Sequence, residues 1–184
     1  MICALAIGTI ACGAGTTSAG GATTASDGSA ETFGIRNGAR PQPRLITAGQ
    51  PTPAQLDAAR AGGVRTVISL RADDEPGQAW EADALMTEGV RFVRIPVHGA
   101  EDLTEEKARQ LDAALAEALA AEGDVLLHCG SSNRVGALMA LRAFYVQGKS
   151  VEEALAVGRA SGLASLEPQV RERLLAACSA LGRC

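Results

Sequence analysis

Residues 125–137 read VLLHCGSSNRVGA, and this stretch decides the fold. The apolar run at its start predicts a buried strand that ends at His128 and Cys129. Four small or polar residues follow, and from Arg134 onward the pattern is typical of a helix. A strand, a tight loop and a helix start, in this order, turn unpaired backbone amides toward one point. The stretch therefore predicts an anion-binding loop with a sulfur atom at its base.

The residue types in this loop suit attack on an oxyanion. A cysteine attacks as the thiolate, which the first amides and the positive end of a helix stabilise. The fork of Arg134 matches two oxygens of a phosphate or sulfate. Gly130, Ser131 and Ser132 let the backbone approach the anion, and we expect them, with Asn133, to bind the substrate.

Each of these residues also has a plainer interpretation. Asn133 tolerates left-handed backbone better than most residues, which suits a curled loop whatever its role. Cys129 by itself is typical of a small buried residue at the end of a strand. His128 either orients the thiolate and the loop backbone or is a hydrogen-bonded histidine at the sheet edge.

The rest of the chain alternates strands with helices. We expect strands at 45–48, 64–70, 90–97 and 125–128, and helices at 53–61, 78–88, 104–122, 134–147 and 165–181. A further helix is expected to begin after Ser150. Thr52 with Gln55, and Ser150 with Glu153, form capping boxes at two helix starts. This alternation predicts an α/β fold with a small parallel sheet of about four or five strands, flanked by helices, and a helical C-terminal end. Ligands of such folds bind at the carboxyl ends of the strands, where His128 and Cys129 lie.

Composition excludes several classes of partner. The 184 residues carry 17 basic and 21 acidic side chains, a formal net charge of −4 without any Lys/Arg-rich block, so we expect no nucleic-acid partner. Only two histidines occur, and no Cys, His, Asp or Glu spacing is typical of a metal site. We therefore expect no metal and no cofactor.

The N-terminus differs from the remainder. Residues 1–12 resemble a shortened lipoprotein signal that ends at Cys12, and residues 13–43 read as a flexible leader rich in Gly, Ala, Ser and Thr. The folded domain is expected at 44–184. Export to the periplasm or cell envelope, with a lipid on Cys12 as a membrane anchor, is one interpretation; a disordered leader on a cytoplasmic protein is the other. At the opposite end, Cys178 and Cys184 either pair or leave a buried Cys178 beside a frayed terminus.

Three stretches together carry a family resemblance: 48–56 (AGQPTPAQL), 63–71 (GVRTVISLR) and the cysteine loop. Over about residues 44–175 the chain resembles cysteine-dependent phosphatases of the tyrosine and dual-specificity class. It is most similar to the bacterial phosphatase-like domain found beside β-lactamase-like hydrolases. The resemblance implies a tyrosine-phosphatase-like domain that hydrolyses phosphate monoesters, in proteins or small molecules, through a phosphocysteine and without metal. Cys129 and Arg134 would be its catalytic residues.

The loop departs from the general phosphatase pattern. Four residues separate Cys129 from Arg134, where that pattern has five, and four is the spacing of rhodanese-like sulfurtransferases. Val135 replaces a hydroxyl residue, and Ser132 replaces a glycine. A sulfurtransferase that forms a persulfide, and a non-catalytic anion-binding module, therefore stand as alternatives.

The resemblance places a general acid in the loop after the strand that ends at Val97. Asp102 is the first choice, and His98 and Glu101 are the other candidates. Asp102 also reads as a helix N-cap, three residues before Glu105. Arg71, after the strand at 64–70, either binds the substrate or pairs with the acidic run at 73–75.

Overall fold

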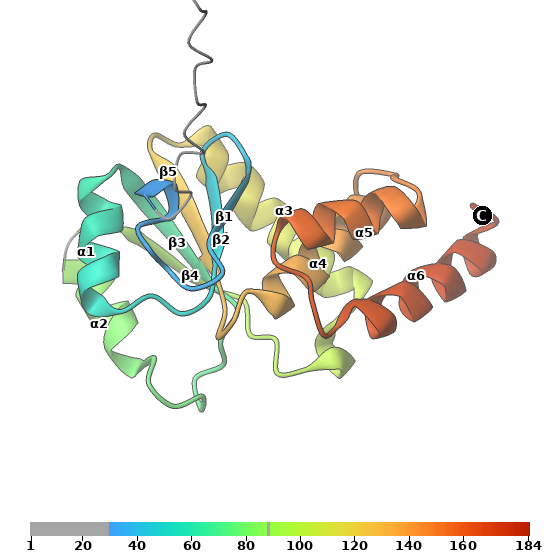
Figure 1. Ribbon diagram of the computed structural model, residues 1–184, viewed down its shortest axis with the longest axis horizontal. Coiled ribbons are helices and arrows are strands. Elements are labelled where there is room, and N and C mark those ends of the chain that lie inside the picture. Colours follow the sequence, from blue (N-terminus) through green and yellow to red (C-terminus); the bar gives the residue numbers. More distant parts are fainter. Residues whose placement is uncertain (1–29, 88) are drawn as a thin grey trace, which may run out of the picture.

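A five-stranded sheet runs through the middle of the molecule in the order β1-β2-β5-β3-β4 (Figure 1). The computed structural model describes residues 30–87 and 89–184. The strands are β1 (Ala39–Gln42), β2 (Leu45–Ala48), β3 (Val64–Ser69), β4 (Arg91–Arg94) and β5 (Asp124–His128). Only β1 runs antiparallel to its neighbour, and the other pairs are parallel. The predicted α/β fold is thus confirmed.

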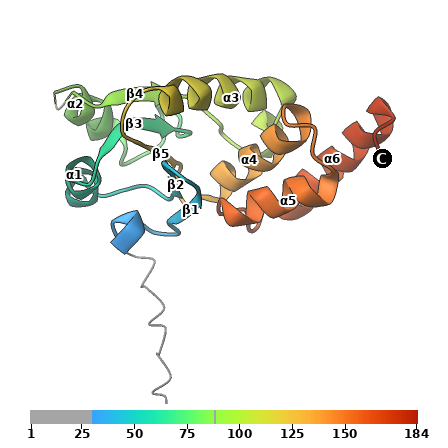
Figure 2. The same cartoon turned by 90° about the horizontal axis from the view of Figure 1, so that it is seen from above.

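Helices cover both faces of this sheet. They are α1 (Pro53–Ala61), α2 (Ala79–Thr87), α3 (Glu105–Ala120), α4 (Asn133–Tyr145), α5 (Val151–Ala160) and α6 (Glu167–Leu181), with short 3-10 turns at Ala30–Thr32 and Ala100–Asp102. One face lies against α1 and α2. The other lies against α3 and α4, and α5 and α6 extend the layer away from the sheet (Figure 2).

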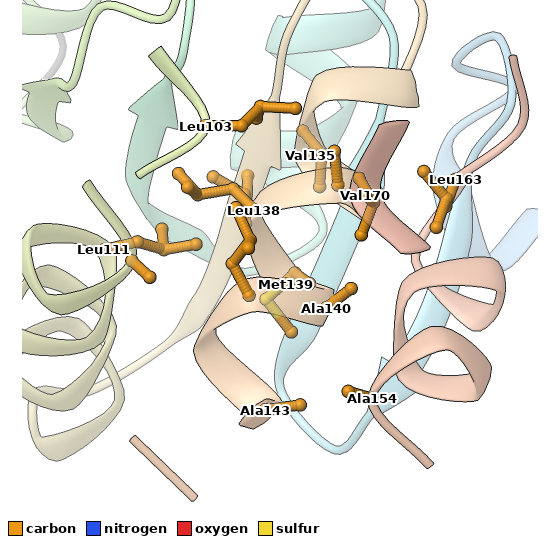
Figure 3. Close-up of a cluster of buried hydrophobic side chains, with 14 of the residues drawn as sticks. Leu103, Leu111, Val135, Leu138, Met139, Ala140, Ala143, Ala154, Leu163 and Val170 are labelled. Atoms are coloured by element: carbon orange, nitrogen blue, oxygen red, sulfur yellow. The ribbon is translucent and has the colours of Figure 1, made fainter. Parts of the chain in front are cut away.

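Helix α4 is the centre of the larger core. Every residue from Val135 to Leu141 is buried, as expected of a helix that is apolar all round. Its side chains meet Leu111 of α3, Ala154 of α5 and Val170 of α6 (Figure 3). Because α4 is enclosed by three helices and the sheet, its first turn, which follows the cysteine loop, has a fixed position.

The helix starts follow the sequence closely. Thr52 and Gln55 form the predicted capping box of α1, and Ser150 and Glu153 form that of α5. Helix α3 is capped by Thr104, whose hydroxyl accepts from the Lys107 amide. The predicted cap at Asp102 is therefore wrong, because that residue lies in the preceding 3-10 turn.

The N-terminal boundary of the folded part needs correction. We expected a flexible leader to residue 43, but β1 pairs with β2, and Ile35 is buried in the cluster beneath α1. Strand β1 reads ARPQ, too short and polar to show as a strand in the sequence. The predicted signal segment 1–12, with Cys12, and leader residues 13–29 lie outside the described residues.

Two further features concern the rest of the chain. Cys178 and Cys184 are joined by a disulfide bond, one of the two arrangements that the sequence allowed. None of the helices among residues 30–87 and 89–184 is long and apolar enough to cross a membrane.

Two glycines test how tightly α4 is held. A Cβ on Gly136 of α4 would lie 2.6 Å from the Gly158 carbonyl oxygen and collide with the Leu163 backbone. A Cβ on Gly158 of α5 would meet mainly side-chain atoms at 2.9 Å. Helix propensity alone favours alanine over glycine by about 1 kcal/mol. We expect Gly136→Ala to lower the free energy of unfolding by about 3 kcal/mol through overpacking, and Gly158→Ala to cost less. Urea denaturation of the two variants checks this order, and a stabilised Gly136→Ala protein would contradict it.

Candidate active site

Cys129 lies directly after β5, at the carboxyl end of the sheet. Its amide donates to the Ala48 carbonyl, 3.3 Å away, and its side chain is a fully buried free thiol. Alternation along β5 directs Leu127 and Cys129 toward α3 and α4, and Leu126 toward α1 and α2. The sulfur thus lies on the face of the sheet that α4 covers.

Arg134 folds back over the cysteine loop. A Cβ built on Gly130 would be 3.4 Å from its Nη2 atom. Its Nη1 donates to Glu75 Oε1 and to the Val97 carbonyl, both at 2.5 Å, and its Nη2 donates to Glu75 Oε2 at 2.8 Å. The Glu75 carboxylate raises the pKa of Arg134, and Cys129 is close enough to contribute to the same shift. The guanidinium therefore points toward the sulfur, and only 16% of the side chain is exposed.

The donors of this guanidinium can be counted. Arginine has five N–H bonds in a planar fork. Glu75 and Val97 accept three of them, which leaves Nε–H and one Nη2–H. Two donors on one edge of the fork match two oxygens of a tetrahedral anion.

Glu75 is the acceptor that holds Arg134 in place. Its hydrogen bond with Arg134 is the main reason that its pKa falls to about 2, with help from the Ala72 amide and from Arg71. The sequence placed Glu75 in an acidic run but did not identify it as the partner of Arg134. The acidic run follows β3 and lies at the same sheet edge as the cysteine. This position was the feature of the sequence that could have identified Glu75 as a partner of Arg134.

Arg71 supports Glu75 instead of facing the anion site. Its Nε donates to Glu75, its Nη1 to Gln50 Oε1 at 2.8 Å, and its Nη2 to the Pro76 carbonyl at 2.7 Å. All three nitrogens thus have protein acceptors. Of the two roles considered for Arg71, the structure shows pairing with the acidic run, and a contact with substrate stays a prediction.

The loop side chains mostly bind the protein. Ser132 has φ 70°, in the left-handed region, and its hydroxyl donates to the Ser161 carbonyl at 3.1 Å. Asn133 begins α4 and accepts from the amides of Ala164 and Leu166. The left-handed residue of the loop is therefore Ser132, and not Asn133 as the sequence suggested. The side chains of both residues anchor the cysteine loop to the segment between α5 and α6. Because these two side chains bind the protein, an anion in the loop would be bound by the backbone amides of Gly130, Ser131, Ser132 and Asn133 instead.

Asn37 is a contact that the sequence did not suggest. Its side-chain amide donates to the Ser131 carbonyl at 2.9 Å. With Asn133 and Ser165 it lines a pocket of about 340 Å³ beside the cysteine loop. No motif or spacing marks this asparagine, because it lies more than 90 positions before the loop that it contacts.

The three candidates for the acid lie after β4. Asp102 Oδ2 accepts from both the backbone amide of His98, at 2.8 Å, and its ring Nδ1, at 2.9 Å. This contact raises the pKa of His98 above its usual 6.5 and lowers that of Asp102. Glu101 is exposed, and its charge adds only a minor contribution to the His98 pKa. His98 follows Val97, whose carbonyl binds Arg134, so the pair stands at the rim of the site.

His128 is fully buried on the face opposite to Cys129. Its ring Nε2 lies 2.9 Å from Oε1 of Glu81 in α2, which is also fully buried. The sequence left the role of His128 open, and no motif or spacing marked Glu81 as its partner. Among the described residues, no group of three or more His, Cys, Asp and Glu side chains is arranged to hold a metal ion.

Comparison with known proteins points in one direction. A family profile described as "DSP-PTPase phosphatase fused to NAD+ Kinase" matches residues 29–172. A β-lactamase hydrolase-like protein of Agrobacterium fabrum is 35% identical over 102 residues, which are 53% of this chain and 23% of the relative. One from Xylella fastidiosa is 32% identical over 123 residues, 65% of this chain and 28% of the relative. The chain thus spans about a quarter of the length of these curated relatives.

Solved structures agree with this family. A candidate phosphatase from Neisseria meningitidis is 28% identical with a TM-score of 0.62, and the alignment covers 76% of this chain and 96% of that one. TpbA from P. aeruginosa is 26% identical with a TM-score of 0.54, over 80% and 88% of the two chains. A TpbA variant has been solved in complex with pTyr; it is 25% identical with a TM-score of 0.52, over 80% and 92%.

The Glu75–Arg134 pair predicts a pH-dependent stability. Because the folded pKa of Glu75, about 2, lies below its ordinary 4.5, the carboxylate stabilises the fold above pH 4.5, and this stability is lost as the pH falls toward 2. We expect Glu75→Gln to lower the free energy of unfolding by about 2 kcal/mol at about pH 7. The difference from wild type should shrink toward about pH 2.5.

Urea denaturation of both proteins at several pH values measures this effect. Glu152→Gln is the matched control, because Glu152 pairs with Arg171 on the surface, where an ion pair contributes about 0–1 kcal/mol. A loss for Glu75→Gln that stays constant with pH would show that its carboxylate is not the source of the stability.

Proposed function

Because the chain belongs to the family described as DSP-PTPase phosphatases fused to NAD+ kinase, we propose that it hydrolyses phosphate monoesters through a phosphocysteine. One observation carries this proposal. Glu75 holds Arg134 over the loop that begins at Cys129, with two N–H donors unused by Glu75 and Val97. A sulfur nucleophile and an oxyanion-binding fork then serve the same phosphorus atom.

The reaction proceeds in two displacements. The Cys129 thiolate attacks phosphorus, an S–P bond forms, and the P–O bond to the leaving group breaks. Arg134 and the amides of the loop from Gly130 to Asn133 bind the three equatorial oxygens, whose charge is spread in the transition state. Water then attacks the phosphocysteine, the S–P bond breaks, and inorganic phosphate leaves with the thiolate restored.

We assign the acid step to His98 and Asp102 acting as a pair. The sequence favoured Asp102 as the acid, but its lowered pKa leaves the carboxyl deprotonated near neutral pH, so it has no proton to give. His98, with a raised pKa and a side chain that is 58% exposed, suits that role better. Its Nδ1 faces Asp102, so Nε2–H gives its proton to the leaving oxygen and later accepts one from the attacking water.

Aryl phosphates, including phosphotyrosine, are the substrates that we propose to test first. The support is the TpbA complex with pTyr, a relative of the same fold, and the pocket of about 340 Å³ beside the cysteine loop, which Ser131 and Asn133 help to line. Export of the chain and a lipid on Cys12 remain proposals of the sequence alone.

Replacing the nucleophile tests the activity. We expect wild type to hydrolyse p-nitrophenyl phosphate and Cys129→Ser to lose at least about 10³-fold in kcat, because a serine hydroxyl is not ionised at neutral pH. Arg134→Lys should lose about 10²–10³-fold, since lysine cannot bind two oxygens with a planar fork. Release of inorganic phosphate measures both.

The spacing of four residues between Cys129 and Arg134 gives a second candidate, a sulfurtransferase. Thiosulfate with cyanide as acceptor is therefore assayed in parallel. Thiocyanate formation that depends on Cys129, without release of phosphate, would show that the protein is a sulfurtransferase and would reject the phosphatase. Phosphate binding without either turnover would indicate an anion-binding module.

The assignment of the acid has its own test. We expect His98→Asn to lose about 10²-fold in kcat on phenyl phosphate, but much less on p-nitrophenyl phosphate, whose leaving group needs little protonation. In wild type, kcat falls as the pH rises through the pKa of His98, above 6.5. Asp102→Asn should move this decline to lower pH, because the partner that raises that pKa is gone.

Asp74→Asn is the control for these variants, because Asp74 is the other carboxylate near His98, 3.9 Å from its Nε2. It should change kcat little on either substrate. A large loss on phenyl phosphate in Asp102→Asn, with His98→Asn nearly unaffected, would make Asp102 the acid.

A further inference from the structure

A row of polar side chains lies under α2, at the ends of three neighbouring strands, and two of them, Ser69 and His128, are fully buried. His128 of β5 and Arg94 of β4 both stand in register with Ser69 of β3. Residues in register on parallel strands point to the same face of the sheet. Glu81 of α2 meets this row from above and lies 2.9 Å from the imidazole of His128.

Glu81 and His128 have no exposed surface. No hydrogen bond with acceptable angles reaches either carboxylate oxygen or either ring nitrogen from the described residues, although Oε1 and Nε2 are at hydrogen-bond distance. The Glu81 carboxylate therefore stands against the Nε2 edge of an imidazole that is wholly enclosed by protein.

Stability does not explain why this pair is present. Removing two ionisable groups from water costs several kcal/mol, and an apolar pair of similar volume is often as stable or more stable. The other charge in the row, Arg94, is already paired with Asp73 and donates to Gln78 Oε1 at 2.7 Å. Buried ionisable pairs of this kind cluster at functional sites.

The pair is connected to the nucleophile through one peptide unit. The His128 carbonyl accepts from the Leu70 amide at 2.8 Å, and the amide of Cys129 donates to Ala48. Both sides of this peptide are thus held by neighbouring strands. A change in the position of the His128 ring is therefore passed to Cys129 through the backbone that the two residues share.

We propose that Glu81 is a positioning residue for the nucleophile: by holding the orientation of the His128 ring, it sets the reactivity of the Cys129 thiol. The effect on turnover rests on the proposed phosphatase function. The effect on the thiol does not, because it concerns the chemistry of the cysteine alone.

The test measures the thiol and turnover separately. Glu81→Gln keeps the size of the side chain and removes the carboxylate. We expect alkylation of Cys129 by iodoacetamide at about pH 6, followed by mass spectrometry of its peptide in the full chain, to slow by about tenfold. The kcat on p-nitrophenyl phosphate should fall by a similar factor, with KM within about twofold. Glu81→Asp, which keeps the carboxylate, should recover part of both.

Asp112→Asn is the matched control. It also removes a carboxylate from an ion pair, 2.7 Å from Arg142, between α3 and α4. It should lower Tm with the alkylation rate and kcat unchanged, because this pair lies away from the strand ends. In a double-variant cycle, Glu81→Gln should add little to His128→Asn, since both act through one contact.

The outcomes separate this inference from the proposed function. A Glu81→Gln protein with lowered Tm but wild-type alkylation would overturn the inference, as would a Cys129 that does not react in wild type. If Glu81→Gln does not fold, the comparison of Glu81→Asp and His128→Asn with wild type decides in the same way. Slowed alkylation in a protein without phosphatase activity would support the role of Glu81 and reject the phosphatase.

Discussion

The arrangement of the site depends on the ion pair between Glu75 and Arg134. It joins the loop after β3 to the loop after β5, and through the Val97 carbonyl it also holds the chain after β4. These three segments leave the sheet at the same edge because their strands are parallel neighbours. Two N–H groups of Arg134 donate to the two carboxylate oxygens of Glu75. The remaining edge of the guanidinium faces the cysteine loop.

Helix α4 supplies the rigid part of this arrangement. Three helices and the sheet surround it, so its first amides cannot adjust to a ligand by moving the helix. The backbone therefore bends within the loop, where Ser132 adopts a left-handed conformation. The side chains of Ser132 and Asn133 bind the segment between α5 and α6. Strain at one loop residue is thus offset by hydrogen bonds to a neighbouring part of the fold.

The two histidines occupy opposite environments. His98 is exposed and bound to Asp102 at the rim, where a proton can exchange with solvent and substrate. His128 is enclosed with Glu81 beneath α2, where no proton can exchange so readily. The same pair of side-chain types, an imidazole and a carboxylate, therefore occurs in two environments: exposed at the rim, where we propose proton transfer, and enclosed beneath α2, where we propose that it fixes an orientation.

The sequence was enough to predict the six helices and the strands β2 to β5 in their order, two capping boxes, and the place of Cys129 and Arg134 at a strand-to-helix loop. These are local properties, because periodicity, caps and loop residues act over a few positions. Only the tertiary structure decided the contacts between distant segments: Glu75 with Arg134, 59 positions apart, Asn37 with Ser131, Glu81 with His128, and β1 with β2. Such contacts depend on which strands become neighbours and on which face each side chain emerges. No short stretch of the sequence contains that information.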